Sequence, residues 1–240
     1  MANPTPIKRR LSLIKAPGER SQSSDIDDFL QHKAVVILAE PGMGKTVLLR
    51  SLEVFGRRYF RARRFLAQEV SPNAAAVLID GLDEARAGDR HGSTLERILG
   101  KLEAFGLPNF VMTCRSGDWF GEIDRTRIVE NVGYDDLAIV QLLPLSREDA
   151  VAVASAFTTK PEQLIAEAER RGLQELLLNP ELVRLLADAV KSGWPATKSD
   201  LFRQAIAVQA AESNDVHAQV AEDITVSEVS EAAGAICATY

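Results

Sequence analysis

The stretch AEPGMGKT at residues 39–46 restricts the fold of this 240-residue chain more than any other part of it. It matches the pattern G-x-x-x-x-G-K-[ST], with Ala39 in place of the first glycine. In this pattern the glycines let successive backbone N–H groups face a phosphate, the lysine reaches the terminal phosphates, and the hydroxyl is offered to Mg²⁺. The pattern is meaningful only between a buried strand and a helix, which the flanking sequence must therefore supply.

The sequence predicts a buried strand before this loop and a helix after it. The run AVVILA at 34–39 is short, apolar and β-branched, which is typical of a strand buried on both faces of a parallel sheet. The segment KTVLLRSLEVF at 45–55 is typical of a helix. We therefore expect a phosphate-binding loop, and the residues expected to contact the nucleotide are Glu40, Pro41, Gly42, Met43, Gly44, Lys45, Thr46 and Val47.

A second strand, predicted at 74–80, runs directly into the acidic stretch DGLDEAR. We expect this strand to lie beside the P-loop strand, so that Asp80 at its end meets the Mg²⁺ that Thr46 also binds. Asp83 and Glu84 are expected to follow in a loop, where either carboxylate could polarise an attacking water. A polar turn would explain these acids if they stood alone, but the preceding P-loop favours the metal-site interpretation.

The order of the remaining predicted elements indicates an α/β protein. Strands at 109–114 and within 137–145 alternate with helices such as 93–105, as in a parallel sheet flanked by helices. From residue 146 onward only helices are predicted, at 146–157, 161–172, 173–190 and 199–213. The predicted fold class is therefore a P-loop NTPase parallel sheet followed by a small all-α helical subdomain.

Three stretches, AEPGMGKT, VLIDGLDE (77–84) and FVMTCR (110–115), together resemble the NACHT branch of the STAND signal-transduction ATPases. The acid-rich DGLDE is the most specific of them. The resemblance implies ATP or ADP with Mg²⁺, and a slow ATPase that acts as an oligomerisation and signalling switch in bacterial defence against phage. It also implies roles for single residues: Walker A for Lys45 and Thr46, Walker B for Asp80, hydrolysis for Asp83 and Glu84, and contact with the γ-phosphate for Arg115.

The stretch LLLNPELVRLLA at 176–187 is similar to the helical-domain motif of the same family. Asn179 has the chemistry of a helix N-cap, and Pro180 that of a first helical residue. The resemblance adds that Pro180 lies against the adenine. One departure from the family pattern is the short segment between the two nucleotide motifs, in which YFRARRFLAQ (59–68) is the only candidate strand.

The sequence predicts a division of the chain into four regions. These are a leader or linker at 1–30, the P-loop domain at 31–145, the helical subdomain at 146–212, and at 213–240 the start of a further domain, which the resemblance implies is winged-helix-like. On this basis we expect the N-terminal portion of a longer protein, whose sensor and effector regions follow. Nucleotide and further copies of the chain are the expected partners.

Charge and composition bear on whether the protein binds nucleic acid or a membrane. The net charge is −6, yet residues 1–64 hold 13 Lys or Arg against 6 Asp or Glu. The arginine-rich stretch at 56–64 could meet nucleic acid, but no stacking-aromatic pattern accompanies it, and we expect a solvated surface. No apolar run is long enough for a membrane span, and two distant cysteines, Cys114 and Cys237, favour a cytoplasmic location.

Two other functions remain open at the level of the sequence. The chain could hold ADP or ATP as a structural element of an assembly, with negligible turnover. It could also be a AAA-type helper ATPase that acts on nucleic acid, which salt-dependent DNA or RNA binding would reveal.

Overall fold

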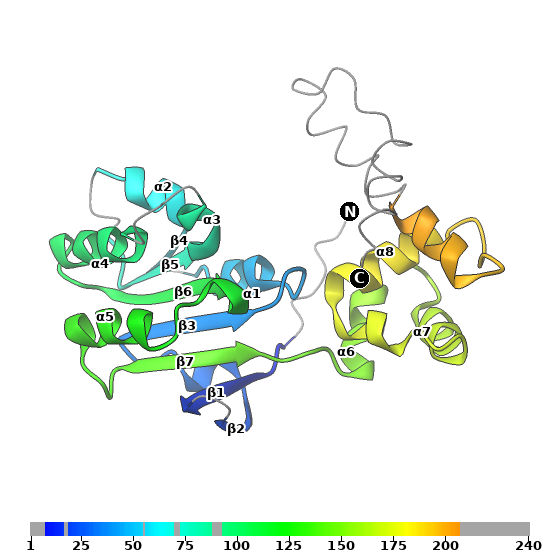
Figure 1. Cartoon of the computed structure of the whole chain (residues 1–240), viewed down its shortest axis with the longest axis horizontal. Coiled ribbons are helices and arrows are strands. Elements are labelled where there is room, and N and C mark those ends of the chain that lie inside the picture. Colours follow the sequence, from blue (N-terminus) through cyan, green and yellow to red (C-terminus); the bar gives the residue numbers. More distant parts are fainter. Residues whose placement is uncertain (1–7, 17–18, 55, 70–72, 88–92, 207–240) are drawn as a thin grey trace, which may run out of the picture. The chain divides into compact units, whose positions relative to one another are not determined.

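The chain divides into two compact units, Met1–Pro144 and Leu145–Tyr240, in the computed structural model of the protein (Figure 1). The structure describes residues 8–16, 19–54, 56–69, 73–87 and 93–206. The predicted start of a further domain at 213–240 lies outside the described residues, as does the last part of the helix predicted at 199–213.

The first unit is built on a seven-stranded sheet with the order β2-β1-β7-β3-β6-β5-β4. Its strands are β1 (Leu11–Ala16), β2 (Glu19–Ser24), β3 (Ala34–Ala39), β4 (Arg57–Arg61), β5 (Ala76–Asp80), β6 (Asn109–Arg115) and β7 (Leu137–Leu142). The strands from β7 to β4 in this order are parallel, whereas β1 runs antiparallel to both β7 and β2. The predicted α/β class with a mainly parallel sheet is therefore confirmed.

Helices cover both faces of this sheet (Figure 1). They are α1 (Lys45–Ser51), α2 (Ala62–Ala67), α3 (Leu82–Arg86), α4 (Thr94–Ala104) and α5 (Glu122–Val132). Alternate residues of β3 point to opposite faces. Val36 belongs to the same apolar cluster as Phe65 of α2 and Leu102 of α4. Ile37 belongs to the cluster that contains Leu49 of α1, so burial on both faces explains the unbroken apolar run of β3.

The strand that carries Asp80 does not lie beside the P-loop strand, contrary to the expectation from the sequence. β6 lies between β3 and β5 and pairs in parallel with both, so that Val36 is opposite Met112 and Leu78 is opposite Val111. All three strands are mainly apolar and are buried along nearly their whole length. Composition alone therefore does not specify which of these strands are neighbours.

Residues 11–16 and 19–24 belong to the sheet, although the sequence indicated a leader or linker at 1–30. β1 pairs with β7, with Leu11 opposite Leu142, and both leucines are buried. An antiparallel strand can bury one face only, so it needs apolar residues only at alternate positions. The alternation in LSLI is short and stands in a basic, proline-containing segment, which gives only a weak strand signal.

The segment between α1 and β5 holds both a strand and a helix. β4 and α2 together span 57–67, where the sequence offered a single candidate strand at 59–68, and β4 forms one edge of the sheet. α3 and α5 were not predicted. α5 is mostly polar, with only Asp124 and Ile128 buried, so its helical pattern in the sequence is weak.

The second unit is helical and, as expected, contains no strand within 145–206. Its helices are α6 (Arg147–Ala154), α7 (Pro161–Arg170) and α8 (Pro180–Ala189), with a further helical segment at 198–206. Their apolar faces meet in one cluster that includes Ile165, Leu186 and Leu201. The helix predicted at 173–190 is divided, because a 3-10 helix at Gln174–Leu178 precedes α8. Throughout the described residues, every helix is too short or too polar to span a bilayer.

Asn179 begins α8 as its N-cap. Its side-chain oxygen accepts hydrogen bonds from the N–H groups of Glu181 at 2.9 Å and Leu182 at 3.4 Å, and Pro180 occupies the first turn. We expect Asn179→Ala to lower the free energy of unfolding of the second unit by about 1 kcal/mol, because these N–H groups lose their acceptor.

This loss can be measured by urea denaturation, with Trp194 as the fluorescent reporter in a Trp119→Phe background. Asn179→Asp keeps an acceptor at the cap and should change the unfolding free energy much less than alanine does. An equal loss in the two variants would contradict the capping role.

Candidate functional site

The P-loop curls between β3 and α1 as its glycines require. Gly42 and Gly44 have φ angles of 76° and 87°, in the left-handed region that residues with a side chain rarely adopt. The loop side chains divide into two sets. The Met43 side chain is buried in the core, whereas Glu40, Pro41 and Val47 are exposed. The buried methionine anchors the loop, and its other side chains remain accessible.

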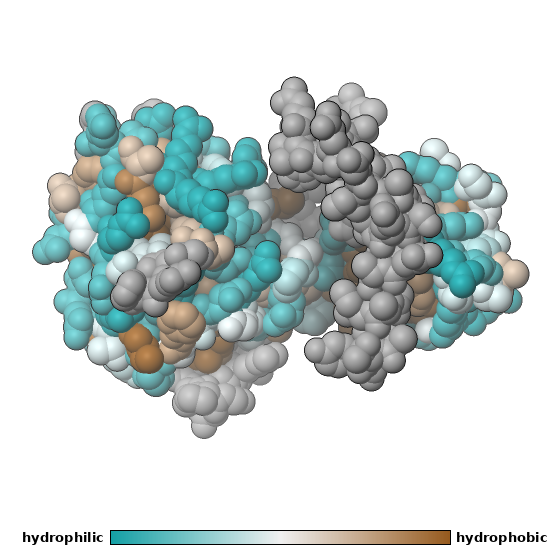
Figure 2. All heavy atoms as spheres, turned by 45° about the horizontal axis from the view of Figure 1, so that its top comes forward, coloured by the Kyte–Doolittle hydropathy of each residue, from teal (hydrophilic) through white to brown (hydrophobic). Residues whose placement is uncertain are grey.

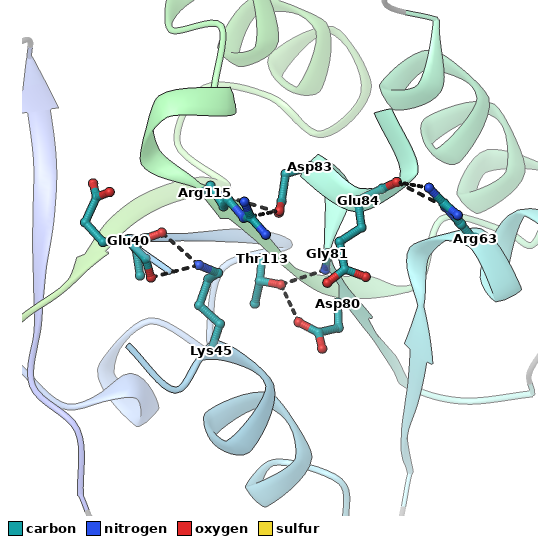
Figure 3. A network of polar contacts seen from close by, with 10 residues as sticks. Glu40, Lys45, Arg63, Asp80, Gly81, Asp83, Glu84, Thr113 and Arg115 are labelled. Atoms are coloured by element: carbon teal, nitrogen blue, oxygen red, sulfur yellow. Dashed lines mark hydrogen bonds and ion pairs between the residues drawn. The ribbon is translucent and has the colours of Figure 1, made fainter. Parts of the chain in front are cut away.

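Lys45 lies over the loop, with its ammonium group directed at the end of β3 (Figure 3). Its Nζ donates hydrogen bonds to the carbonyl oxygens of Ala39 at 2.8 Å and Glu40 at 3.1 Å. Burial lowers the pKa of Lys45; Arg115 lowers it further, while Asp83 acts in the opposite direction. A nearby anion would stabilise the charged form of Lys45, which burial and Arg115 both disfavour.

Asp80, at the end of β5, is the centre of a hydrogen-bond network that joins three strands and the P-loop. Thr46 Oγ1 donates to its Oδ2 at 2.7 Å, and Tyr59 of β4 donates from its hydroxyl to the same oxygen at 2.8 Å. Thr113 of β6 donates to Oδ1 at 2.6 Å and accepts from the N–H of Gly81 at 2.9 Å. Asp80 is only 8% exposed. The structure thus brings together the two residues that were predicted to share Mg²⁺.

The P-loop and the acid that it meets identify the architecture of the first unit. The first unit has the P-loop NTPase fold. Its loop follows a central parallel strand, and a buried acid reaches the loop from a strand two positions away in the sheet, across β6.

The sequence reasoning missed both Thr113 and Tyr59. Thr113 is the one polar residue inside the buried run FVMTC, and it is fully buried. A buried hydroxyl needs a hydrogen-bond partner, so its position within an apolar strand was a usable signal. Tyr59 gave no such signal, because half-buried tyrosines are common in edge strands.

Tyr59→Phe is expected to lower the free energy of unfolding of the first unit by about 1–2 kcal/mol, because the carboxylate of Asp80 loses a donor. Burial and the hydrogen bond to Asp80 both raise the pKa of Tyr59, so the hydroxyl stays a donor at neutral pH. Urea denaturation followed by Trp119 fluorescence, in a Trp194→Phe background, would measure the change.

A matched control for this substitution is Tyr134→Phe. Tyr134 is 65% exposed, and its hydroxyl accepts a hydrogen bond from Arg125. We expect it to change the unfolding free energy by less than about 0.5 kcal/mol. Equal effects of the two substitutions would show that the bond from Tyr59 to Asp80 adds no stability of its own.

Asp83 and Glu84 lie in the helix α3 and not in a loop as predicted. Asp83 accepts a hydrogen bond from the N–H of Arg115 at 3.2 Å and forms an ion pair with its Nε at 2.8 Å. The Asp83 side chain is only 7% exposed, while that of Arg115 is 48% exposed. The carboxylate of Asp83 therefore binds Arg115, the last residue of β6, which lies beside it (Figure 3).

Glu84 presents the other carboxylate of this helix. Its main-chain oxygen accepts two hydrogen bonds from Arg63, at 3.0 Å and 2.7 Å. No described residue donates a hydrogen bond to its carboxylate, which extends along Gly81 (Figure 3). A β-carbon built on Gly81 would lie 3.3 Å from Glu84 Cδ, so the two residues are in close contact. Of the two acids, Glu84 is the one with a carboxylate free to bind water.

A cleft of about 830 Å³ opens beside α3. Its walls include Asp83, Glu84, Gly81 and Arg115, together with Arg61 and Arg63 from the end of β4 and the start of α2. Glu84 is exposed and lines this cleft, so solvent reaches its carboxylate.

Pro180 belongs to the second unit, where it begins α8. The other predicted site residues all belong to the first unit. The structure therefore assembles the loop, Asp80, Asp83, Glu84 and Arg115 at one edge of one sheet, and it describes Pro180 only within its own helix.

No protein-family model and no curated protein matches this chain. Solved structures that resemble it include the replication initiator DnaA bound to AMPPCP and single-stranded DNA, at 14% identity and a TM-score of 0.47, covering 82% of this chain and 70% of that one. Domain III of the Thermotoga maritima replication initiation protein DnaA resembles it at 13% identity and a TM-score of 0.40, covering 83% and 82%. The S. cerevisiae Hsp104–ADP complex does so at 13% and 0.45, covering 81% and 32%. At such low scores these likenesses assign no function.

Proposed function

We propose that the first unit binds ATP with Mg²⁺ and hydrolyses it slowly. The observation that carries this proposal is the hydrogen bond of 2.7 Å between Thr46 of the P-loop and Asp80 of β5. These residues are 34 positions apart in the chain and lie on elements separated by β6. A hydroxyl and a carboxylate that meet beside a P-loop supply the oxygen ligands that Mg²⁺ prefers.

The loop fits the phosphate groups of a nucleotide. The positive φ angles of Gly42 and Gly44 allow the N–H groups of the loop to converge on one anion. The ammonium group of Lys45, now on two carbonyl oxygens of the same loop, would move to the β- and γ-phosphates. Bound Mg²⁺ would neutralise part of the phosphate charge.

For hydrolysis we assign Glu84 to the attacking water and Arg115 to the γ-phosphate. Glu84 has a carboxylate without a described donor, and the cleft next to it gives access to solvent. The ion pair with Asp83 holds the Arg115 guanidinium at the end of β6. A guanidinium fixed in this way stabilises developing charge without having to reorganise during the reaction.

The wider role follows the sequence resemblance to NACHT-type STAND ATPases. On that basis the protein is a nucleotide-dependent switch that self-associates, with Pro180 against the adenine of the bound nucleotide. Defence signalling in a bacterial cytoplasm, and sensor or effector regions in a longer protein, belong to the same proposal. A nucleotide-holding module with negligible turnover would use the same loop but would not need Glu84.

A second candidate function is binding of nucleic acid at the β4 edge of the sheet. Five arginines lie within 57–64, and four of them, Arg58, Arg61, Arg63 and Arg64, are exposed. The face of the first unit seen in Figure 2 is mainly hydrophilic, with hydrophobic residues in small separate patches. Binding of labelled single-stranded DNA that weakens steeply with salt would support this function, and no binding at low salt would remove it.

The first test of the proposal is equilibrium binding of ATP with Mg²⁺ to the purified protein by calorimetry, together with chromatography of any nucleotide released on denaturation. Bound ADP or a measurable affinity for ATP supports it. A protein that is folded by circular dichroism but contains no nucleotide and binds none contradicts it.

A further inference from the structure

The N-terminal segment reaches the P-loop because of the direction of β1. β1 runs antiparallel to β7, with Leu11 opposite Leu142, so the residues before β1 lie at the carboxyl end of β7. β7 is parallel to the P-loop strand β3, and its carboxyl end is therefore at the same edge of the sheet as the P-loop. Arg9 stands at this position.

Arg9 bridges two separate main-chain segments. Its Nη1 donates a hydrogen bond to the carbonyl oxygen of Met43 in the P-loop at 2.7 Å, and its Nη2 donates to the carbonyl oxygen of Leu143 at 2.8 Å. The N–H of Leu143 donates in turn to the carbonyl oxygen of Arg10 at 3.0 Å. Arg9 is only 8% exposed, although its neighbours Lys8 and Arg10 are exposed.

The chemistry of arginine suits this bridge. A guanidinium is always charged and presents its donors in a rigid planar fork, so it can hold two acceptors at a fixed separation. Hydrogen bonds from an ionised donor are shorter and stronger than neutral ones. A buried charge is costly without such partners, so the segment is held where both carbonyl oxygens are available.

The contact with Met43 has a consequence for phosphate binding. In a planar trans peptide, the C=O of one residue and the N–H of the next point in opposite directions. Because the carbonyl of Met43 points at Arg9, the N–H of Gly44 points away from Arg9. Gly44 is one of the two glycines whose positive φ shapes the loop.

We propose that Arg9 is a positioning residue of the nucleotide site: it orients the Met43–Gly44 peptide for phosphate binding and ties the P-loop to Leu143. Leu143 directly follows β7 and lies two residues before the start of the second unit at Leu145. A change in the P-loop on nucleotide binding is thereby linked to the segment that leads into the helical unit. This inference rests on the proposed ATP binding.

The test compares Arg9→Met and Arg9→Lys with the control Lys8→Met. Lys8 precedes Arg9, its side chain is 85% exposed, and its ion pair is with Asp25. We expect Arg9→Met to weaken the binding of ATP with Mg²⁺ by about 10- to 100-fold and Arg9→Lys to give an intermediate loss, because one ammonium group cannot hold both carbonyls equally. Lys8→Met should bind as the unchanged protein does.

A second readout separates positioning from general stability. Hydrogen–deuterium exchange of the amides at 42–46, measured without added nucleotide, should be faster in Arg9→Met than in Lys8→Met, while exchange in the core of β6 stays the same. Uniformly faster exchange in Arg9→Met, or an affinity for ATP equal to that of the unchanged protein, would overturn the proposal. If Arg9→Met does not fold, Arg9→Lys decides by the same two criteria.

The exchange measurement also distinguishes the two proposals from each other. If the unchanged protein binds no ATP, the proposed function fails, yet faster exchange at 42–46 in the Arg9 variants would still establish that Arg9 holds the loop. If the unchanged protein binds ATP and the Arg9 variants bind it equally well, only the role of Arg9 is refuted.

Discussion

Replacing Lys45 with alanine is expected to weaken the binding of ATP with Mg²⁺ by at least about 30-fold. The substitution removes the cation of the loop, whose other expected phosphate ligands are neutral N–H groups and a hydroxyl. Loss of one partner from a desolvated charge pair costs about 2 kcal/mol or more. In the structure, the hydrogen bonds of Lys45 go to the main-chain carbonyl oxygens of Ala39 and Glu40, so its truncation takes no hydrogen-bond donor from a carboxylate. Calorimetric titration measures the loss.

The matched control for Lys45→Ala is Lys101→Ala. Lys101 lies on α4 of the same unit, and its Nζ donates a hydrogen bond of 2.6 Å to the carbonyl oxygen of Leu66, so it has a comparable main-chain contact away from the P-loop. We expect this variant to keep its nucleotide affinity. Equal affinities for Lys45→Ala and the control would mean that the loop does not bind the phosphates.

Glu84→Gln is expected to lower kcat for ATP hydrolysis by about 10²- to 10⁴-fold while changing nucleotide affinity only a few-fold. The amide has nearly the shape of the carboxylate but cannot take up a proton from water, and general-base catalysis contributes a factor of this size. Release of phosphate under saturating ATP measures kcat, and calorimetry measures the affinity separately.

Asp83→Asn should behave differently from Glu84→Gln. The substitution breaks the ion pair that holds Arg115, so it should lower both the thermal stability of the first unit and the rate of hydrolysis. A loss of turnover in Asp83→Asn with full turnover in Glu84→Gln would reverse the roles assigned to the two acids. Unchanged turnover in both would favour a module that holds nucleotide without hydrolysing it.

The phosphate loop could be predicted because its requirements are local. The turn depends on glycines at 42 and 44, on the lysine and threonine that follow, and on an apolar strand directly before it. Asp80 was predictable from local sequence too, because it directly follows an apolar run and is the last residue of a strand. The helices of the second unit follow from 3.6-residue periodicity and from the cap at Asn179.

Other parts of the site could not be derived from neighbouring residues. The sequence could not choose between Asp83 and Glu84, because both were expected in a loop. In the structure both lie on α3, and Asp83 forms the ion pair with Arg115. It also placed the acid-bearing strand next to the P-loop strand, because the apolar runs of β3, β5 and β6 are chemically interchangeable.

The sequence by itself determined the P-loop, the acid at the end of β5, the α/β order of the first unit and the helical character of the second. Each of these depends on residues within a few positions of one another. Only the tertiary structure decided that β6 separates β3 from β5, that Tyr59 and Thr113 bind Asp80, and that Arg9 reaches the P-loop. The physical reason is that a hydrogen bond depends on the distance and direction between atoms, and for residues far apart in the chain these are set by how the strands pair and pack.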